Sequence, residues 1–326
     1  MAWIAAQATT RPSPCRLATH WRAAPTTART AAATHRWAPS RQSLKDQTSP
    51  VCRRLSDWPT RGVRTLVVRG VLTTVISIGL AAAVGRLIHV LSVQAPLFWI
   101  IELTLILSLV DVRRPWRNAI ALANALERDG LAGGRLALPA LSSRDPIHAD
   151  VYEVARLGVE ALASCFISGL IGPALSYLFF GLGGLFAYQA LILLSDLPAD
   201  SQPFNAFSNW LAVVIEWPIS NIGALALVLA AVPMKGAQPR HSLRTFLGYC
   251  GTVNRTKNGA AIAATAGALG LALEGPRHYV SGVISRPWLG KGKARVGPED
   301  ILAAARLFFW GCCIVGALIA LLAIFV

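Results

Sequence analysis

The stretch VVRGVLTTVISIGLAAAVGRLIHVLSV at 67–93 decides the class of fold. A helix needs roughly 20 apolar residues to cross a hydrocarbon core that is about 30 Å thick. This stretch is long enough, with Arg69 near its start and Arg86 and His89 near its end. It therefore predicts a transmembrane helix.

Further apolar runs follow the first one. Glu102 lies inside the second run, and Pro173 and Gly181 interrupt the third. Since ionisable groups are costly in a bilayer, Glu102 is expected either to serve a site or to pair with an arginine near the interface. The sequence thus predicts an all-α, polytopic integral membrane helix bundle of about five spans joined by cytoplasmic loops. The predicted spans are 67–93, 96–110, 158–197, 210–232 and 301–326.

Composition excludes most other classes of protein. Hydrophobic residues make up 54% of the 326 residues and charged residues only 14%, against about 25% charged in an average soluble domain. The net charge is +15, but with this hydrophobicity the basic excess points to lipid and cytoplasmic loops rather than to nucleic acid. The expected partner is the lipid bilayer, and no nucleic-acid partner is expected.

The N-terminal segment, 1–57, does not look like a folded element. It is rich in Ala, Thr, Arg, Ser and Pro, and no acidic residue precedes Asp46. Three interpretations stay open, namely a transit-like peptide, a disordered cytoplasmic arm and a misassigned start. The membrane domain is expected to occupy 58–326.

Basic residues predict the orientation, because Lys and Arg gather in cytoplasmic loops. They are frequent just before the first span, in 111–157 and in 234–300, and absent from 195–209. We therefore expect a multi-pass protein of the inner (cytoplasmic) membrane with a cytoplasmic N-terminus. The pattern is consistent only if 158–197 crosses once, as a long or broken helix. A hairpin at 181–184 would give six spans.

A short run of small apolar residues, 259–273, lies inside one of the basic stretches. Small residues let helices approach closely in a bilayer. We expect a re-entrant or interfacial helix here, and a sixth span is the alternative.

Several motifs occur together in the second half of the chain. They are LPALSSRD at 138–145, RLGVE at 156–160, GAAIAATAGALG at 259–270, GPRHY at 275–279 and RPWLG at 286–290. In this order and spacing they resemble the CobD/CbiB family, the integral membrane adenosylcobinamide-phosphate synthases of cobalamin biosynthesis. The resemblance covers about half the chain.

The resemblance implies an enzyme that activates the carboxyl of adenosylcobyric acid with ATP and joins it to an aminopropanol phosphate as an amide. ATP and Mg²⁺ are the implied cofactors, because Mg²⁺ offsets phosphate charge. A corrinoid is the implied substrate. The implied catalytic residue is Glu160, and the implied substrate-binding residues are Arg144, Asp145, Arg156, Gly259 and Tyr279. Carboxylates would have to hold the Mg²⁺, and which residues these are stays open.

The chain departs from the family pattern at several polar positions. Ser164, Cys165 and Ser168 stand where the family has Glu, Asn and Asp, and Gln189 replaces a basic residue. Glycines, prolines and packing residues are kept, which fits a retained fold with altered or absent chemistry. The alternatives are therefore a non-catalytic paralogue with a scaffold or binding role, and an AmpE-like membrane sensor or transporter. A polar cluster at the cytoplasmic mouth of the bundle is expected from Arg144, Asp145, Arg156 and Glu160.

Overall fold

The computed structural model describes residues 63–94, 98–142, 149–197, 202–250, 257–275, 277–279, 282–284 and 287–325. The predicted N-terminal segment, 1–57, lies outside these residues. The helices are α3 (Val63–Gln94), α4 (Phe98–Leu109), α5 (Arg113–Ala137), η1 (Leu138–Ala140), α6 (Val151–Phe166), η2 (Ile167–Ile171), α7 (Gly172–Ser195), α8 (Gln202–Ala230), α9 (Pro239–Cys250), α10 (Gly259–Leu269) and α11 (Pro298–Phe325). Short strands β1 (Leu273–Glu274), β2 (Arg277–Tyr279), β3 (Gly282–Ile284) and β4 (Trp288–Leu289) lie between α10 and α11.

Four helical segments of the described chain are long and apolar enough to cross a bilayer. They are Thr65–Ser92, Val151–Ser195, Phe204–Ala230 and Pro298–Leu321, and they coincide with four of the five predicted runs. On α3 the large apolar side chains Leu72, Ile76 and Leu80 are more than half exposed, which suits contact with lipid rather than with water. The predicted class, a helical membrane bundle, is confirmed.

The remaining predicted run, 96–110, holds helix α4, which has 12 residues. Such a helix is about 18 Å long, shorter than the hydrocarbon core. Its Glu102 accepts hydrogen bonds from Ser92 Oγ at 2.6 Å and from Tyr177 Oη at 3.2 Å. Glu102 Oε1 also lies 3.1 Å from His89 Nδ1. The carboxylate therefore pairs with His89 of α3, and no arginine among the residues that the structure describes is its partner.

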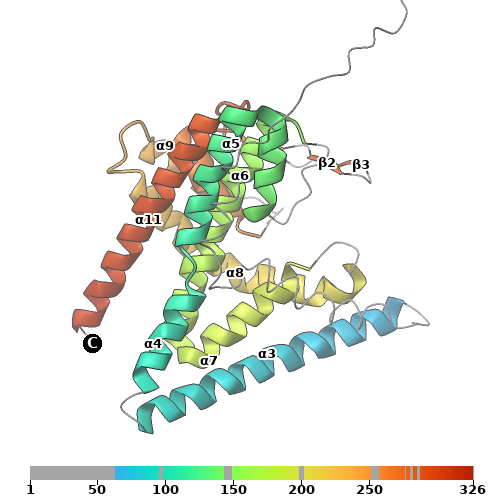
Figure 1. The fold of residues 1–326 in the computed structure, drawn as a ribbon, viewed down its shortest axis with the longest axis vertical. Helices are drawn as coiled ribbons and strands as arrows, with labels where there is room; N and C mark the ends of the chain where they lie inside the picture. Colours follow the sequence, from blue (N-terminus) through green and yellow to red (C-terminus); the bar gives the residue numbers. More distant parts are fainter. Residues whose placement is uncertain are drawn as a thin grey trace, which may run out of the picture. The chain divides into compact units, whose positions relative to one another are not determined.

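The helical run of α6, η2 and α7 reverses direction within α7. Gly181 has φ 65° and ψ −156°, a conformation that is essentially restricted to glycine. A Cβ added at Gly172 would overlap the Tyr188 hydroxyl, although a straight helix would separate these residues by about 24 Å. The arms before and after Gly181 thus approach each other, and Figure 1 shows α7 leaving the line of α6. The structure differs here from the expected single crossing, because the chain turns back at Gly181.

Helix α3 packs along the second arm of α7 and the start of α8 through glycines (Figure 1). A Cβ on Gly70 would overlap the carbonyl of Phe204, and a Cβ on Gly85 would press on the backbone of Leu182 and Gly183. Backbones that approach this closely gain van der Waals contact, which helps to drive helix association in lipid. The first apolar run is therefore attached to the bundle by its small residues.

Helices α9 and α10 form an antiparallel hairpin packed beside α8. The amide of Gln238 donates to Ala268 O at 2.8 Å, and Ser242 Oγ donates to Ala264 O at 2.7 Å. Every residue of α10 from Gly259 to Ala268 is buried. With 11 residues the helix is too short to span a bilayer, and its burial on all sides favours the re-entrant alternative for 259–273 over an interfacial helix or a sixth span.

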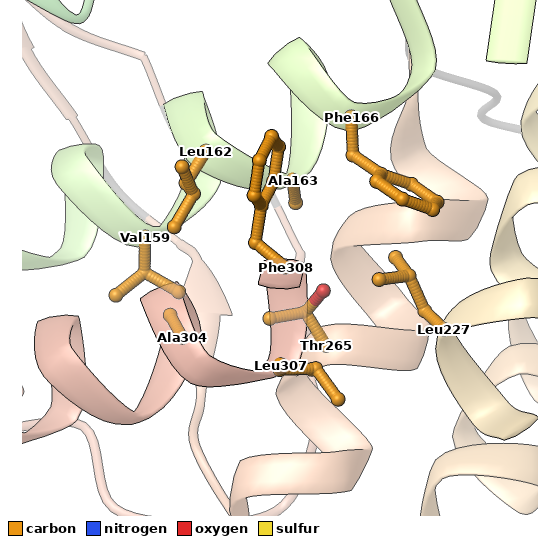
Figure 2. Close-up of a pocket in the computed structure, with 9 residues that line it drawn as sticks. All are labelled: Val159, Leu162, Ala163, Phe166, Leu227, Thr265, Ala304, Leu307 and Phe308. Carbon is orange, nitrogen blue, oxygen red and sulfur yellow. The ribbon is translucent and has the colours of Figure 1, made fainter. Parts of the chain in front are cut away.

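The core lies where α6, α8, α10 and α11 meet. A cavity there has a volume of about 10 Å³, barely the room that one water molecule needs. Figure 2 shows the residues that line it. Its lining is apolar except for Thr265, whose hydroxyl already donates to Ala261 O at 2.9 Å. The lining residues are Val159, Leu162, Ala163, Phe166, Leu227, Thr265, Ala304, Leu307 and Phe308. This is close packing and not a ligand site.

The segment between α10 and α11 packs against α6 and α10 through β1 and β4. β1 pairs with β4, and β2 pairs with β3. Lys293 Nζ lies 3.1 Å from Asp300 Oδ2 and 3.2 Å from Glu299 Oε1, at the start of α11. The hydrogen bonds to Asp300 and Glu299 raise the pKa of Lys293 above its ordinary value. This side chain therefore fixes the end of the segment to α11.

Candidate functional site

Helix α6 carries three charged residues on one buried face. Glu153, Arg156 and Glu160 follow each other at intervals of three and four, the spacing that places side chains on one side of a helix. Their relative exposures are 7%, 8% and 1%. Asp150 caps the helix by accepting a hydrogen bond from the amide of Glu153, which fixes where this face begins.

Strand β1 meets this face of α6. The amide of Glu274 donates to Glu160 Oε1 at 2.7 Å, and Glu274 itself is 2% exposed. Glu274 has a φ of 62° and Gly275 a φ of 74°, so the backbone turns sharply at this contact. The structure thus brings together two carboxylate residues that are far apart in sequence.

Strand β4 completes the arrangement. Trp288 is the partner of Glu274 in the β1–β4 register, and the Arg156 guanidinium carbon lies 5.0 Å from the centroid of its ring. A cation over an indole face is attracted by the ring quadrupole. Arg156 and Glu160, one helical turn apart, therefore reach neighbouring positions of the same strand pair. We call Glu153, Arg156, Glu160, Glu274 and Trp288 the Glu160 cluster.

The residues implied by the family resemblance do not all gather here. Arg156 and Glu160 lie together, but Gly259 starts α10, whereas Glu274 follows its other end, about 16 Å further along the axis. Arg144 and Asp145 lie outside the described residues. Tyr279 ends β2, and its side chain lies outside the described part. Glu274 and Trp288 were not predicted. In the sequence, Glu274 could have been noticed only because it precedes Gly275, and Trp288 only because it lies within the motif at 286–290.

A second buried polar cluster lies at the start of α10. Lys257 Nζ is 2.9 Å from Ser195 Oγ, 3.0 Å from Asp196 Oδ1 and 3.8 Å from Glu216 Oε2. Tyr188 Oη donates to Glu216 Oε1 at 3.0 Å. We call Tyr188, Ser195, Asp196, Glu216 and Lys257 the Lys257 cluster. It joins the second arm of α7, the middle of α8 and the tip of the α9–α10 hairpin.

The positions at which the chain departs from the family pattern are polar but uncharged. Ser168 lies in η2, a five-residue π-helix, and its hydroxyl donates to Ser164 O at 3.1 Å. π-Helical turns inside α-helices often mark functional sites. Within this irregular turn, Ser168 directs its hydroxyl to its own helix.

A resident metal centre is not built from the side chains that the structure describes. Among them no group of three or more His, Cys, Asp and Glu could hold a metal ion. A magnesium ion that arrives with a nucleotide needs only one or two protein carboxylates. Glu153, Glu160 and Glu274 are the carboxylate residues that the Glu160 cluster offers for that purpose.

The fold and the Glu160 cluster define a helical membrane protein with ionic side chains sequestered at one end of its core. A family profile described as CobD/Cbib protein matches residues 48–308. The chain therefore belongs to the CobD/Cbib family, as the motifs predicted. No solved structure matches it.

Individual relatives agree with this assignment, and three of the most similar share the name cobalamin biosynthesis protein CobD. The protein from Sinorhizobium sp is 30% identical over 262 residues, which cover 78% of this chain and 81% of the relative. The protein from Rhizobium meliloti (strain 1021) is 31% identical over 257 residues, covering 75% and 77%. The protein from Brucella anthropi is 30% identical over 280 residues, covering 84% and 81%.

Proposed function

We propose that this chain acts in cobalamin biosynthesis as a membrane-bound synthase that forms an amide between adenosylcobyric acid and an aminopropanol phosphate, with ATP as the energy source. Family membership supports the pathway. One observation carries the chemistry, namely the burial of Glu160 beside Arg156 and Glu274 at the end of the core. Burying ionic groups is expensive, so such groups tend to be kept where a function needs them.

Each residue of the Glu160 cluster has a role in this proposal. Amide formation joins the amine nitrogen to the carboxyl carbon and releases a proton from the amine, and Glu160 is the proposed acceptor of that proton. Arg156 is the proposed ligand of a carboxylate or phosphate oxygen, because its planar guanidinium suits such oxyanions. Glu274 positions Glu160 through its backbone amide.

ATP and Mg²⁺ are the proposed cofactors. When bound, ATP would supply the activation that lets the carboxyl oxygen leave. Glu274 is the proposed holder of the accompanying Mg²⁺, and the corrinoid and the lipid bilayer are the proposed partners.

We further propose a multi-pass arrangement in the inner membrane with the N-terminus and the Glu160 cluster on the cytoplasmic side. The positive-inside rule supports it, because Arg156 and Trp288 belong to the two basic stretches 111–157 and 234–300. Both stretches lie on one side despite the turn at Gly181 if the second arm of α7, 182–195, which is about 21 Å long, does not cross the bilayer. The contact between their side chains is consistent with both stretches lying on one side.

A non-catalytic relative that binds a corrinoid is the second candidate. The replacements Ser164, Cys165 and Ser168 favour it, because acidic and amide groups that suit phosphate chemistry have been lost there. The two candidates differ in whether product forms.

The purified full chain in lipid nanodiscs separates them when it is supplied with adenosylcobyric acid, aminopropanol phosphate and Mg-ATP. We expect an amide product by mass spectrometry, with the rate reduced about 10²–10⁴-fold in Glu160→Gln, the range for loss of a positioned base. Glu127→Gln, which changes an exposed carboxylate on α5, is the matched control and should keep the wild-type rate. Corrinoid binding without product would support the second candidate. Full activity in Glu160→Gln would remove Glu160 from the site.

A further inference from the structure

A groove lies on the outside of the bundle between the start of α5 and the middle of α11. It has a volume of about 320 Å³ and is lined by Val112, Arg113, Trp116, Arg117, Phe308, Phe309 and Cys312. α5 and α11 are in contact, and Figure 1 shows α11 diverging from α4 and α5 towards the C-terminus. The groove is therefore open on the side where the two helices separate.

The groove lies where the sequence changes between apolar and charged residues, both at the junction of α4 and α5 and along α11. α4 ends at Leu109, and the chain then carries Asp111, Arg113, Arg114 and Arg117. On α11 the last charged residue is Arg306, after which the sequence is apolar to its end. Trp116 lines the groove and Trp310 follows Phe309, and tryptophan is enriched at the membrane–water interface. The groove thus sits at the level of the lipid headgroups.

Two positively charged side chains lie at the edge of the groove. Arg113 and Arg117 are one helical turn apart and exposed, and across the described ranges neither forms an ion pair. Their neighbour Arg114, by contrast, lies 3.9 Å from Asp111. Opposite them Phe309 is 54% exposed. The surface of the groove itself is almost entirely apolar, and the aliphatic parts of Arg113 and Arg117 contribute to it, so the two exposed guanidinium groups lie at its edge.

We propose that this groove binds an anionic phospholipid, with the headgroup phosphate on Arg113 and Arg117 and an acyl chain along Phe308, Phe309 and Cys312. Guanidinium groups bind phosphate oxygens in bidentate fashion, and basic residues beside a membrane attract anionic lipids. The apolar wall favours a lipid over free phosphate. The volume is at the small end for ligand sites, which suits a headgroup and the first part of one chain while the rest stays in the bilayer. This site is independent of the proposed amide synthesis.

The test uses the full chain, delipidated in a neutral detergent and titrated with phosphatidylglycerol or phosphatidylcholine of identical acyl chains. Native mass spectrometry counts bound lipid, and the shift in melting temperature reports stabilisation, since a ligand that binds only the folded state stabilises it. We expect phosphatidylglycerol to bind at least tenfold more tightly than phosphatidylcholine. Arg113→Gln/Arg117→Gln should abolish this preference. Arg128→Gln, an exposed arginine further along α5, should retain it.

A second variant changes the apolar wall of the groove. It still tests the proposal if the double arginine variant folds poorly. Cys312→Trp fills the groove and should weaken binding of both lipids. The proposal is overturned if the double arginine variant keeps the preference, or if Cys312→Trp binds both lipids as the wild type does. It is also overturned if inorganic phosphate alone displaces bound phosphatidylglycerol at equal concentration, which would indicate a site for free phosphate.

Discussion

At the scale of single residues, the Lys257 cluster raises the question of how a buried carboxylate is stabilised. Glu216 is 0% exposed and lies in the middle of α8, which is long and apolar enough to span a membrane. A carboxylate buried there needs compensation, and Tyr188 and Lys257 supply it. Lys257 is thus expected to stabilise the fold by compensating charge at the tip of the α9–α10 hairpin.

Lys257→Met tests this role. Removing one partner of a buried pair should cost about 3 kcal/mol, at the low end of the usual range because Lys257 remains partly exposed. The melting temperature in detergent should fall accordingly. Lys291→Met, which removes an exposed lysine, is the control and should leave it unchanged. Adding Glu216→Gln to Lys257→Met should restore part of the loss, and strictly additive effects of the two substitutions would contradict a coupled pair.

The sequence alone predicted the charged site residues of α6 but not the residues that contact them. Glu160 and Arg156 could be found because they lie in one short motif on one helix. Glu274 and Trp288 could not, because pairing of β1 with β4 places them beside α6, and sequence spacing does not encode which strands pair. The cluster around Lys257 was not predicted, because the partners of Lys257 come from α7 and α8.

At the scale of elements, two helices are interrupted in the same way. Gly130 in α5 has φ 60° and ψ −141°, close to the angles of Gly181 in α7. Nothing lies within 4 Å of a Cβ at either position, so the requirement for glycine is one of backbone conformation and not of space. Each glycine therefore sets a reversal of the helical chain.

Gly181→Ala should destabilise the protein by about 1–3 kcal/mol, the usual cost of holding a residue with a Cβ in such a conformation. Gly79→Ala is the matched control, since it also meets open space but lies inside regular α3. There alanine should be neutral or stabilising by up to about 1 kcal/mol. Equal melting temperatures for the two variants would argue against the reversal at Gly181.

Hydropathy predicted where the apolar helices lie in the sequence, but not whether the chain continues straight or turns back within them. The apolar run through 158–197 looks the same whether the chain continues or turns back, because hydrophobicity carries no direction. The glycines at 181, 183 and 184 signalled an interruption, and only the contact of Gly172 with Tyr188 defines the reversal. Likewise the run at 96–110 is apolar, but its helix, α4, has only 12 residues.

At the scale of the whole molecule, α10 links the two polar clusters. The Lys257 cluster lies at its start and the Glu160 cluster beyond its end, and the helix between them is buried throughout. Small side chains along α10 make this burial possible, since Gly267 packs on the backbone of Ser242. The family pattern of small residues at 259–270 is thus explained by packing.

The central claim is that this membrane bundle, with its Glu160 cluster, carries out a step of cobalamin biosynthesis. The most direct measurement is growth of a strain that lacks adenosylcobinamide-phosphate synthase, supplied with adenosylcobyric acid under conditions that require adenosylcobalamin. We expect the full chain to restore growth and adenosylcobalamin synthesis in this strain. A strain that stays unable to make adenosylcobalamin, although the protein is well expressed and inserted in its membrane, would contradict it.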